Sequence, residues 1–506
     1  MGERLMNIGR GTLGVIAGVL MVMLATIGHV LSPPAFDPPP LRASPQFRDI
    51  PAQPAAEVRP IAGAGFGGGP FRTEKLLVPA RNETLRATIR APLSPGRHPA
   101  FVFVQGSGSG DGGEFTQQAE WLARAGVVTL AYDKRTVGYS FRSRDFGLLA
   151  DDALRMLRVL RQRPDVDPAR AGLWGVSEGG WVVPIAAARD PRAAFVVLVS
   201  SPNVSPLRQV AWALNEQLLR LHAPTGVRDL LTRVMGGVGF DFLRYDGAPA
   251  LRGITQPVLA LYGTDDPSIP FVESTQALTR ALRQSGDTGY TIRFLAGADH
   301  AMRVNGGAFA ADYLPTLANW IRDLPRTARP SVPIAGATPV QRFEAADVPA
   351  APWWGDSTIL WLTLCLAAVG YVAAPVTEMV VRLRGRDLRF QVNVQRWPAI
   401  RRRLRRMAWI GLGELAAVMA FITLIVLFSV NQAGAWPAVQ AGWLVVRLLA
   451  VAMLAQTVAM FAAVAGGLRD GWEPTPWQKS VLAGVLGGTA LLLLTAAYYG
   501  LFAFPW

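Results

Sequence analysis

Ala171-Gly-Leu-Trp-Gly-Val-Ser177-Glu-Gly-Gly180 is the stretch that decides the fold of this chain. A short apolar run leads into Ser177, and a helix-compatible run, residues 181–188, follows it. A strand, a sharp turn between small residues and a helix are the context of a nucleophile elbow, because glycines allow the tight turn that exposes one serine hydroxyl. The Gly-x-Ser-x-Gly pattern also arises by chance. Ser177 is therefore a candidate nucleophile whose partners must be found elsewhere in the chain.

A second apolar run, residues 258–262, ends in Gly263-Thr-Asp-Asp-Pro-Ser-Ile-Pro270. Together with the Ser177 turn, it resembles the α/β-hydrolase superfamily, and within it the bacterial esterases that overlap with dienelactone-hydrolase-like and serine-aminopeptidase-like proteins. Those families have Gly-x-x-Asp-x-x-Val-Pro after the corresponding strand. The resemblance implies that Asp266 is the acid of a catalytic triad and that Asp265 is a turn or helix-capping residue.

A serine nucleophile needs an imidazole to accept its proton and a carboxylate to orient that imidazole. In α/β-hydrolases the order along the chain is serine, acid, histidine. The chain has only four histidines. His29 lies in an apolar N-terminal segment, and His98 and His222 precede the acid, so only His300 fits. It ends the sequence Gly297-Ala-Asp-His300, which is similar to the family's Gly-x-x-His loop.

Strand and helix patterns alternate over residues 71–326, which predicts an α/β domain with a largely parallel sheet covered on both faces. Residues 74–79 and 84–91 are expected to form antiparallel edge strands. The glycine-rich loop 106–113 follows an apolar strand, where the family supplies an oxyanion-hole amide. The resemblance implies that the backbone amides of Ser107 and Glu178 bind the oxyanion.

Four further residues lie near these loops: two depart from the family's pattern, and two are expected to have a structural role. Gln105 stands where the family usually has a histidine before the loop glycine, and Thr136 replaces the glycine of the Tyr-Asp-x-Arg-Gly turn. We expect Asp133 and Arg135 of that turn to form a structural salt bridge. The loop 106–113 lacks the Gly-Lys-[Ser/Thr] sequence of a nucleotide-binding loop, which argues against phosphate binding.

A long insertion, about residues 202–256, separates two predicted strands and exceeds an ordinary connection. Apolar residues recur in it at helical spacing around residues 210–221 and 230–235. The resemblance implies a helical cap over the active site. Its apolar side chains either line an acyl pocket or pack on the core, and the sequence leaves both readings open.

Five apolar segments are long enough to cross a membrane. The first, residues 11–31, is interpreted as an uncleaved anchor, with a signal peptide as the alternative. Four more are expected within residues 357–506, and the linkers 32–70 and 327–356 read as tethers rich in proline, glycine and alanine. Residues 382–406 hold ten arginines and one acid, so this loop is expected on the cytoplasmic side. We therefore expect a multi-pass protein of a bacterial inner membrane, with residues 71–326 on the periplasmic or extracellular side.

The net charge of +14 over 506 residues invites a nucleic-acid interpretation. Most of it lies in the arginine-rich loop between two apolar segments, which argues against a nucleic-acid partner. The single cysteine, Cys365, excludes an intramolecular disulfide framework. The few histidines and the cysteine form no cluster of metal-ligand spacing, so no metal or other cofactor is expected.

The sequence thus predicts a membrane-anchored serine hydrolase that cleaves small-molecule or lipid-like carboxylic esters through an acyl-enzyme on Ser177. The alternatives are a serine peptidase of the aminopeptidase type, or an acyltransferase, that uses the same triad. Glu216 is the only acid in residues 202–228, which favours esters over peptides with a free amino terminus. A membrane protein whose hydrolase fold only binds a ligand is a further alternative. Membrane lipid is an expected partner, and the sequence does not determine the oligomeric state.

Overall fold

A computed structural model describes residues 10–42, 47–65, 70–108, 110–286, 289–383, 397–431 and 436–504. The chain divides into two compact units, which we describe separately. The sheet unit comprises Asp37–Glu216 and Phe240–Asp347. The helical unit comprises Met1–Phe36, Gln217–Gly239 and Val348–Trp506.

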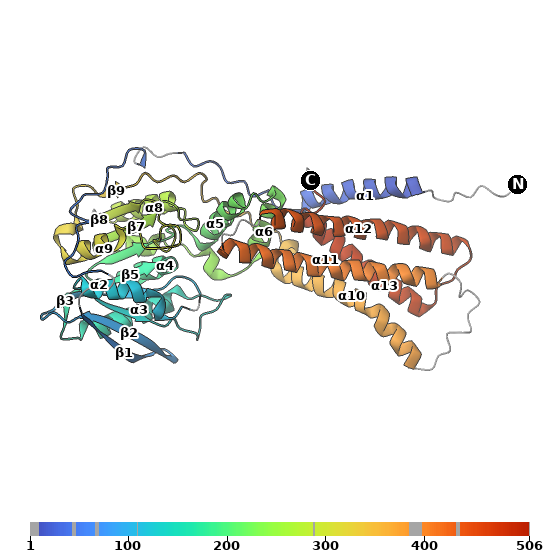
Figure 1. Ribbon diagram of the computed structural model, residues 1–506. Helices are drawn as coiled ribbons and strands as arrows, with labels where there is room; N and C mark the ends of the chain where they lie inside the picture. The colour runs from blue at the N-terminus through green and yellow to red at the C-terminus, as the bar shows by residue number, and fades with distance from the viewer. Residues whose placement is uncertain are drawn as a thin grey trace. The chain divides into compact units, whose positions relative to one another are not determined.

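The described residues of the sheet unit form a nine-stranded sheet with the order β1-β2-β4-β3-β5-β6-β7-β8-β9. Figure 1 shows strands of this sheet with helices beside them. The strands β1 and β2 pair antiparallel, as predicted, and β2 also pairs antiparallel with β4. All other pairs are parallel, which confirms the largely parallel sheet. The bounds are β1 Phe71–Ala80, β2 Glu83–Pro92, β3 His98–Val104, β4 Val128–Tyr132, β5 Val166–Val176, β6 Val196–Val199, β7 Val258–Gly263, β8 Tyr290–Leu295 and β9 Ile334–Gly336.

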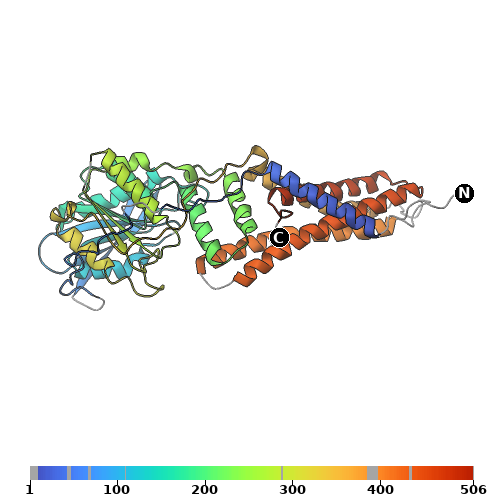
Figure 2. The same cartoon turned by 90° about the horizontal axis from the view of Figure 1, so that it is seen from above.

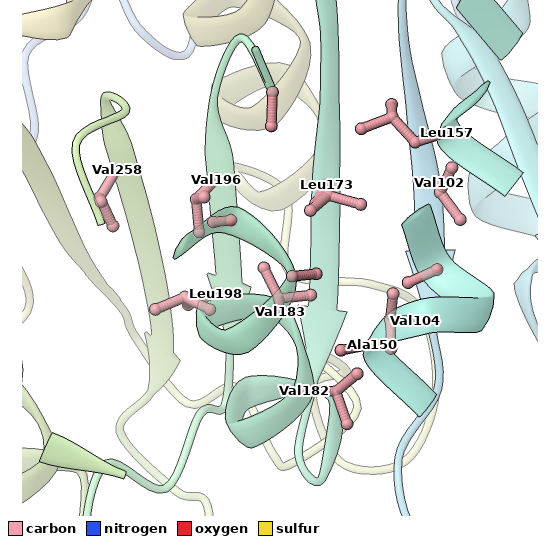
Figure 3. Close-up of a cluster of buried hydrophobic side chains, with 14 of the residues drawn as sticks. Val102, Val104, Ala150, Leu157, Leu173, Val182, Val183, Val196, Leu198 and Val258 are labelled. Atoms are coloured by element: carbon pink, nitrogen blue, oxygen red, sulfur yellow. The ribbon is translucent and has the colours of Figure 1, made fainter. Parts of the chain in front are cut away.

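Helices cover both faces of this sheet because successive residues of each buried strand point to opposite faces. In β3, Val102 and Val104 share a core with α3 (Phe146–Arg161), α4 (Gly179–Arg189) and α8 (Phe271–Gln284). Phe101 and Phe103 belong to the opposite core, with α2 (Thr116–Arg124) and α9 (Tyr313–Arg322). Figure 3 shows the first of these cores, where Val182 and Val183 of α4 lie among strand residues. The apolar strands of the sequence are thus buried on both sides.

Residues 37–42 and 47–59 belong to the sheet unit, although residues 32–70 were expected to be a tether. The ring of Phe47 is buried and lies edge-on to Phe294 of β8, with 6.0 Å between centroids. The carboxylate of Glu57 accepts two hydrogen bonds of 2.6 Å from the guanidinium of Arg293, whose side chain is fully buried. A charge buried in a strand requires a partner. Glu57 supplies it from a segment without any periodic pattern.

Replacing Glu57 with glutamine should destabilise the sheet unit by about 3 kcal/mol, because it leaves the buried Arg293 charge without its counter-ion. The measurement is the thermal unfolding of the full chain in detergent. The double variant E57Q/R293M should lose less stability than the sum of the two single losses. An E57Q protein that unfolds like the wild type would contradict this role of the ion pair.

The strand β9 lies within residues 327–356, which were expected to be a linker. It extends the sheet by pairing in parallel with β8, Ile292 facing Ile334. Gln341 further along accepts a hydrogen bond of 3.0 Å from the amide of Val272. A strand of three residues among prolines and alanines has no alternation to detect, so the sequence pattern missed it.

Long helices make up most of the helical unit. They are α1 Arg10–Leu31, α10 Ser357–Leu383, α11 Trp397–Asn431, α12 Trp436–Arg469 and α13 Pro476–Tyr498. Within the described residues, four stretches are long and apolar enough to cross a membrane, namely Gly11–Leu31, Trp397–Ile425, Pro437–Arg469 and Pro476–Tyr498, and Ser357–Val372 of α10 is a shorter apolar stretch. Helix α10 packs on α13 and α11 packs on α12, and Figure 2 shows the C-terminal helices side by side. The expected apolar helices are therefore present.

Part of the arginine-rich segment is helical. Helix α11 begins at Trp397, so Arg401 to Arg406 lie on its first turns, whereas residues 384–396 lie outside the described residues. Pro398 occupies the first turn, a position where proline is compatible with a helix. The helix thus begins before its apolar part, and hydropathy alone does not predict this start.

The insertion 202–256 forms helices, as expected. They are α5 Pro206–Arg220, α6 Thr225–Gly237, the 3₁₀ helix η3 Asp241–Arg244 and α7 Ala248–Arg252. Helix α6 belongs to the helical unit, where the Arg233 guanidinium donates a hydrogen bond of 2.7 Å to the carbonyl of Tyr498. A Cβ on Gly226 would lie 2.6 Å from the Trp443 ring, so this helix packs closely there. For α6 this favours the packing alternative over an acyl pocket.

Candidate active site

Ser177 occupies a strained turn between β5 and α4. Its φ is +52°, in the left-handed region that non-glycine residues seldom adopt. The strand β5 ends one residue before it, and α4 begins at Gly179. The Ser177 amide donates a hydrogen bond of 3.1 Å to the carbonyl of Val199 at the end of β6. Strained non-glycine residues of this kind gather at functional sites, which supports this serine as a candidate.

The glycines beside Ser177 are needed because three backbone segments meet here. A Cβ on Gly175 would lie 2.5 Å from the carbonyl oxygen of Gly179. A Cβ on Gly179 would lie 2.4 Å from the carbonyl oxygen of Val104 in β3. The elbow can therefore form only where side chains are absent, which explains the spacing of the motif in physical terms.

Asp266 and His300 lie on the loops after β7 and β8 and are hydrogen bonded. His300 Nδ1 and Asp266 Oδ2 are 2.9 Å apart, and Asp266 Oδ1 accepts a bond of 2.7 Å from the Ser268 amide. The Asp266 side chain is 1% exposed and that of His300 is 32% exposed. Asp265, in contrast, is exposed, and its amide donates to the carbonyl of Ala298. The structure thus pairs His300 with Asp266 rather than with Asp265.

Competing effects set the pKa of His300. Burial lowers it, whereas the charge of Asp266, the hydrogen bond to that carboxylate and the charge of Asp299 raise it. The net result is a pKa above the ordinary value of histidine. A base has to be unprotonated to accept a proton, so a raised pKa moves the onset of general-base activity to higher pH.

The end of β6 connects the serine turn with the histidine loop. The Ser177 amide binds Val199, and the hydroxyl of the next residue, Ser200, donates a bond of 3.1 Å to the carbonyl of His300. Within the described part of the chain, no hydrogen bond joins the Ser177 hydroxyl to His300. Catalytic contacts of this kind often tighten only when substrate binds. Sequence analysis missed Ser200, because nothing in its local pattern indicates contact with a residue 100 positions later.

The loop after β3 lies against Ser177. A Cβ on Gly106 would be 3.2 Å from the Cβ of Ser177, so the next residue, Ser107, carries its amide close to the turn. Glu178 precedes α4, and the first amides of a helix have no carbonyl partner within the helix. Both positions are compatible with the predicted oxyanion donors. Gln105 is buried and donates a bond of 2.6 Å to the carbonyl of Tyr132, so it fixes the loop from behind.

Sequence analysis missed the side chain of Glu178. It is 1% exposed, and its carboxylate accepts from Lys134 Nζ at 2.8 Å, from the Tyr139 hydroxyl at 2.8 Å and from Arg144 at 2.6 Å. We call these four residues the Glu178 cluster. The sequence signal for this cluster was weak: Lys134, Tyr139 and Arg144 follow β4 within a dozen positions, and only the fold brings them to Glu178, the residue after Ser177.

The turn residues Asp133 and Arg135 form salt bridges, but with partners other than each other. Arg135 pairs with Asp152 at 2.7 Å, and both side chains are buried. Asp133 pairs with Arg86 at 2.6 Å and accepts a bond of 3.0 Å from the Gly112 amide. Their role is therefore structural. Among the residues that the structure describes, no group of three histidine, cysteine or acidic side chains is arranged to hold a metal ion.

The chain is similar to one family model and to curated proteins, two of which are described below. Residues 114–324 match the model of the prolyl oligopeptidase family. The chain is 31% identical over 165 residues to the polyketide transferase ATR5 of Stachybotrys chlorohalonatus, which covers 30% of this chain and 54% of that protein. It is 32% identical over 110 residues to the polyketide transferase claH of Penicillium crustosum, which covers 20% and 36%. The chain thus spans about half, or less, of the curated relatives it matches.

Solved structures are similar at lower identity. The DcsB complex with its substrate analogue has a TM-score of 0.38 at 18% identity, over 50% of this chain and 99% of that chain. Dienelactone hydrolase from Anabaena variabilis ATCC 29413 has a TM-score of 0.34 at 20% identity, over 49% and 95%.

Proposed function

We propose that the chain, which carries an α/β-hydrolase domain of the serine-hydrolase type, cleaves carboxylic esters through an acyl-enzyme on Ser177. The observation that carries this proposal is the hydrogen-bonded pair of Asp266 and His300, next to the strained turn of Ser177. A buried carboxylate that fixes one nitrogen of a partly exposed imidazole leaves the other nitrogen available to the nucleophile.

The reaction follows from these positions. Ser177 Oγ attacks the ester carbonyl carbon while His300 Nε2 accepts the serine proton. The amides of Ser107 and Glu178 bind the oxygen that becomes negative. His300 then gives its proton to the departing alkoxide, which leaves as an alcohol. In the second half of the reaction, water attacks the acyl-enzyme carbonyl while His300 accepts a proton from it. His300 returns that proton to Ser177 Oγ as the carboxylic acid is released. Asp266 holds the imidazole in the required tautomer and stabilises its cationic form.

Two observations support the alternatives to ester hydrolysis. The family model of prolyl oligopeptidases supports a peptidase, and the relatives named polyketide transferases support acyl transfer to an acceptor other than water. We favour esters because Glu216 is the only acid in residues 202–228, a poor site for a peptide amino terminus.

We further propose that the apolar helices hold the domain at a membrane, which would give it access to lipid-like esters. The arginines before and within α11 favour a cytoplasmic position for that end of the helix. The same charge rule then assigns residues 71–326 to the periplasmic or extracellular side of a bacterial inner membrane.

Labelling with a fluorophosphonate tests the proposal on the full chain in detergent. The probe should react at Ser177, identified by peptide mapping, and denatured protein should remain unlabelled, because only an activated serine reacts. Labelling at another residue, or none on folded protein, would reject the assignment and favour a role in ligand binding.

Parallel assays then separate the alternatives. We expect p-nitrophenyl esters to be cleaved with higher kcat/KM than aminoacyl p-nitroanilides. An added alcohol that diverts most of the acyl group from water would instead identify a transferase, and a preference for the anilides would identify a peptidase.

A further inference from the structure

The Glu178 cluster is too well connected to be a chance surface ion pair. The side chains of Lys134 and Glu178 are 4% and 1% exposed, and Arg144 is 16% exposed. Burying such charges is unfavourable unless they are paired and hydrogen bonded. The Lys134 ammonium also lies 4.7 Å from the centre of the Tyr139 ring. The cluster therefore holds each of its members in one geometry.

The same cluster binds the loop after β3 on both sides of Ser107. Lys134 Nζ donates a hydrogen bond to the carbonyl of Gly106, and the Gly108 amide donates one of 3.1 Å to the Tyr139 hydroxyl. The Lys134 amide adds a bond of 3.0 Å to the carbonyl of Gly110. One ammonium therefore contacts both the loop that carries Ser107 and the carboxylate of Glu178.

The Gly106 carbonyl and the Ser107 N–H belong to one peptide group. A trans peptide is planar, so its N–H and C=O point in opposite directions. Fixing the carbonyl oxygen with a buried ammonium therefore fixes the direction of the N–H on the other side. The positive charge also polarises the peptide and strengthens the N–H as a donor, because linked hydrogen bonds reinforce one another.

We propose that Lys134 and Tyr139 are positioning residues that aim the Ser107 amide at the oxyanion and couple it to the second donor, Glu178. This inference rests on the proposed function and deepens it. Neither side chain is assigned a contact with substrate. Both act through the Gly106–Gly108 backbone, so they should affect the transition state and the tetrahedral intermediate more than the bound ester.

The test uses full-length K134M and Y139F in detergent, with p-nitrophenyl ester kinetics and a trifluoromethyl ketone that mimics the tetrahedral adduct. Removing one oxyanion donor costs about 10²–10³ in kcat. We therefore expect kcat to fall about 100-fold in K134M and about tenfold in Y139F, with KM unchanged within about twofold. The affinity for the ketone should fall by the same factor as kcat. K134R, which retains a cationic donor, should recover part of the loss.

The matched control is E83Q. Glu83 accepts bonds of 3.1 and 3.2 Å from the amides of Thr136 and Val137, on the same turn as Lys134 and Tyr139, and also pairs with Arg135. This variant should loosen the turn while kcat and ketone affinity stay close to those of the wild type. Equal losses in E83Q would show that general loosening, rather than aiming of the Ser107 amide, explains the effect.

Tyr139 keeps the test decisive if K134M does not fold, because Y139F retains the ring and removes only the hydroxyl. Folded variants that change KM or thermal stability but leave kcat and ketone affinity at wild-type values would overturn the inference. If S177A is inactive while K134M or Y139F keeps wild-type kcat and ketone affinity, the positioning role is rejected and the proposed function stands. If S177A keeps its activity, the proposed function itself is rejected.

Discussion

Replacing Ser177 with alanine should reduce the turnover of p-nitrophenyl esters by roughly 10⁶-fold, the loss measured when a serine hydrolase loses its nucleophile. Without the hydroxyl no acyl-enzyme forms, and His300 has no proton to accept. A residual rate above that of water should remain, because the oxyanion donors and the binding surface are intact. The measurement is kcat of the purified full chain, together with loss of fluorophosphonate labelling.

Ser200 provides a matched control for this substitution. It is a serine with positive φ (+44°) at the same edge of the sheet, and its hydroxyl donates to the backbone of His300. S200A should lose about tenfold or less, since one neutral hydrogen bond contributes about 0.5–1.5 kcal/mol. A larger loss in S200A than in S177A would place the nucleophile elsewhere. Comparable thermal unfolding of both variants would exclude misfolding as the cause.

The sequence predicted the fold class, an α/β-hydrolase fold with added apolar helices, and the family match and the sheet order confirm it. This was possible because the signals are local. The elbow needs small residues at fixed spacing, and a strand buried on both faces is a continuous apolar run. The assignments of Ser177, Asp266 and His300 rest on the same local motifs, and they stay predictions until the variants are measured.

The features that the sequence did not predict depend on contacts between distant segments. Glu57 and Arg293 are 236 positions apart, and neither lies in a pattern that indicates the other. The Glu178 cluster joins residues that follow β4 to the residue after Ser177. The insertion 202–256 was recognised as helical from its spacing, but its periodicity does not reveal that α6 packs with α12 and α13. Periodicity reports which face of a helix is buried and not which element buries it.

The inserted segment 202–256 is divided between the two units. Since α6 belongs to the helical unit, the C-terminal helices contribute to the packing of this inserted segment. In the sheet unit, Gln209 of α5 donates a bond of 2.6 Å to the carbonyl of Ser268, two residues after Asp266. The beginning of the inserted segment is therefore attached to the loop that carries the predicted acid.

Replacing Asp266 with asparagine should lower kcat by about 10⁴-fold, the loss caused by the same change in a serine protease triad. The amide cannot stabilise the imidazolium ion and favours the wrong tautomer of His300. The pKa of His300 should fall as well, because the carboxylate charge that raises it is removed while the burial that lowers it remains.

The pH profile of kcat/KM tests the expected fall in the pKa of His300. His300 must be neutral to act as a base, so activity in the wild type rises as pH passes the raised pKa of His300. In D266N the remaining activity should therefore rise at lower pH than in the wild type. The control is D265N, which changes the exposed neighbouring carboxylate. In this variant kcat should stay within about twofold of the wild type, and activity should rise at the same pH. If D265N changes the pH at which activity rises and D266N does not, then Asp265 is the acid, and the pairing of Asp266 with His300 is not the one used in catalysis.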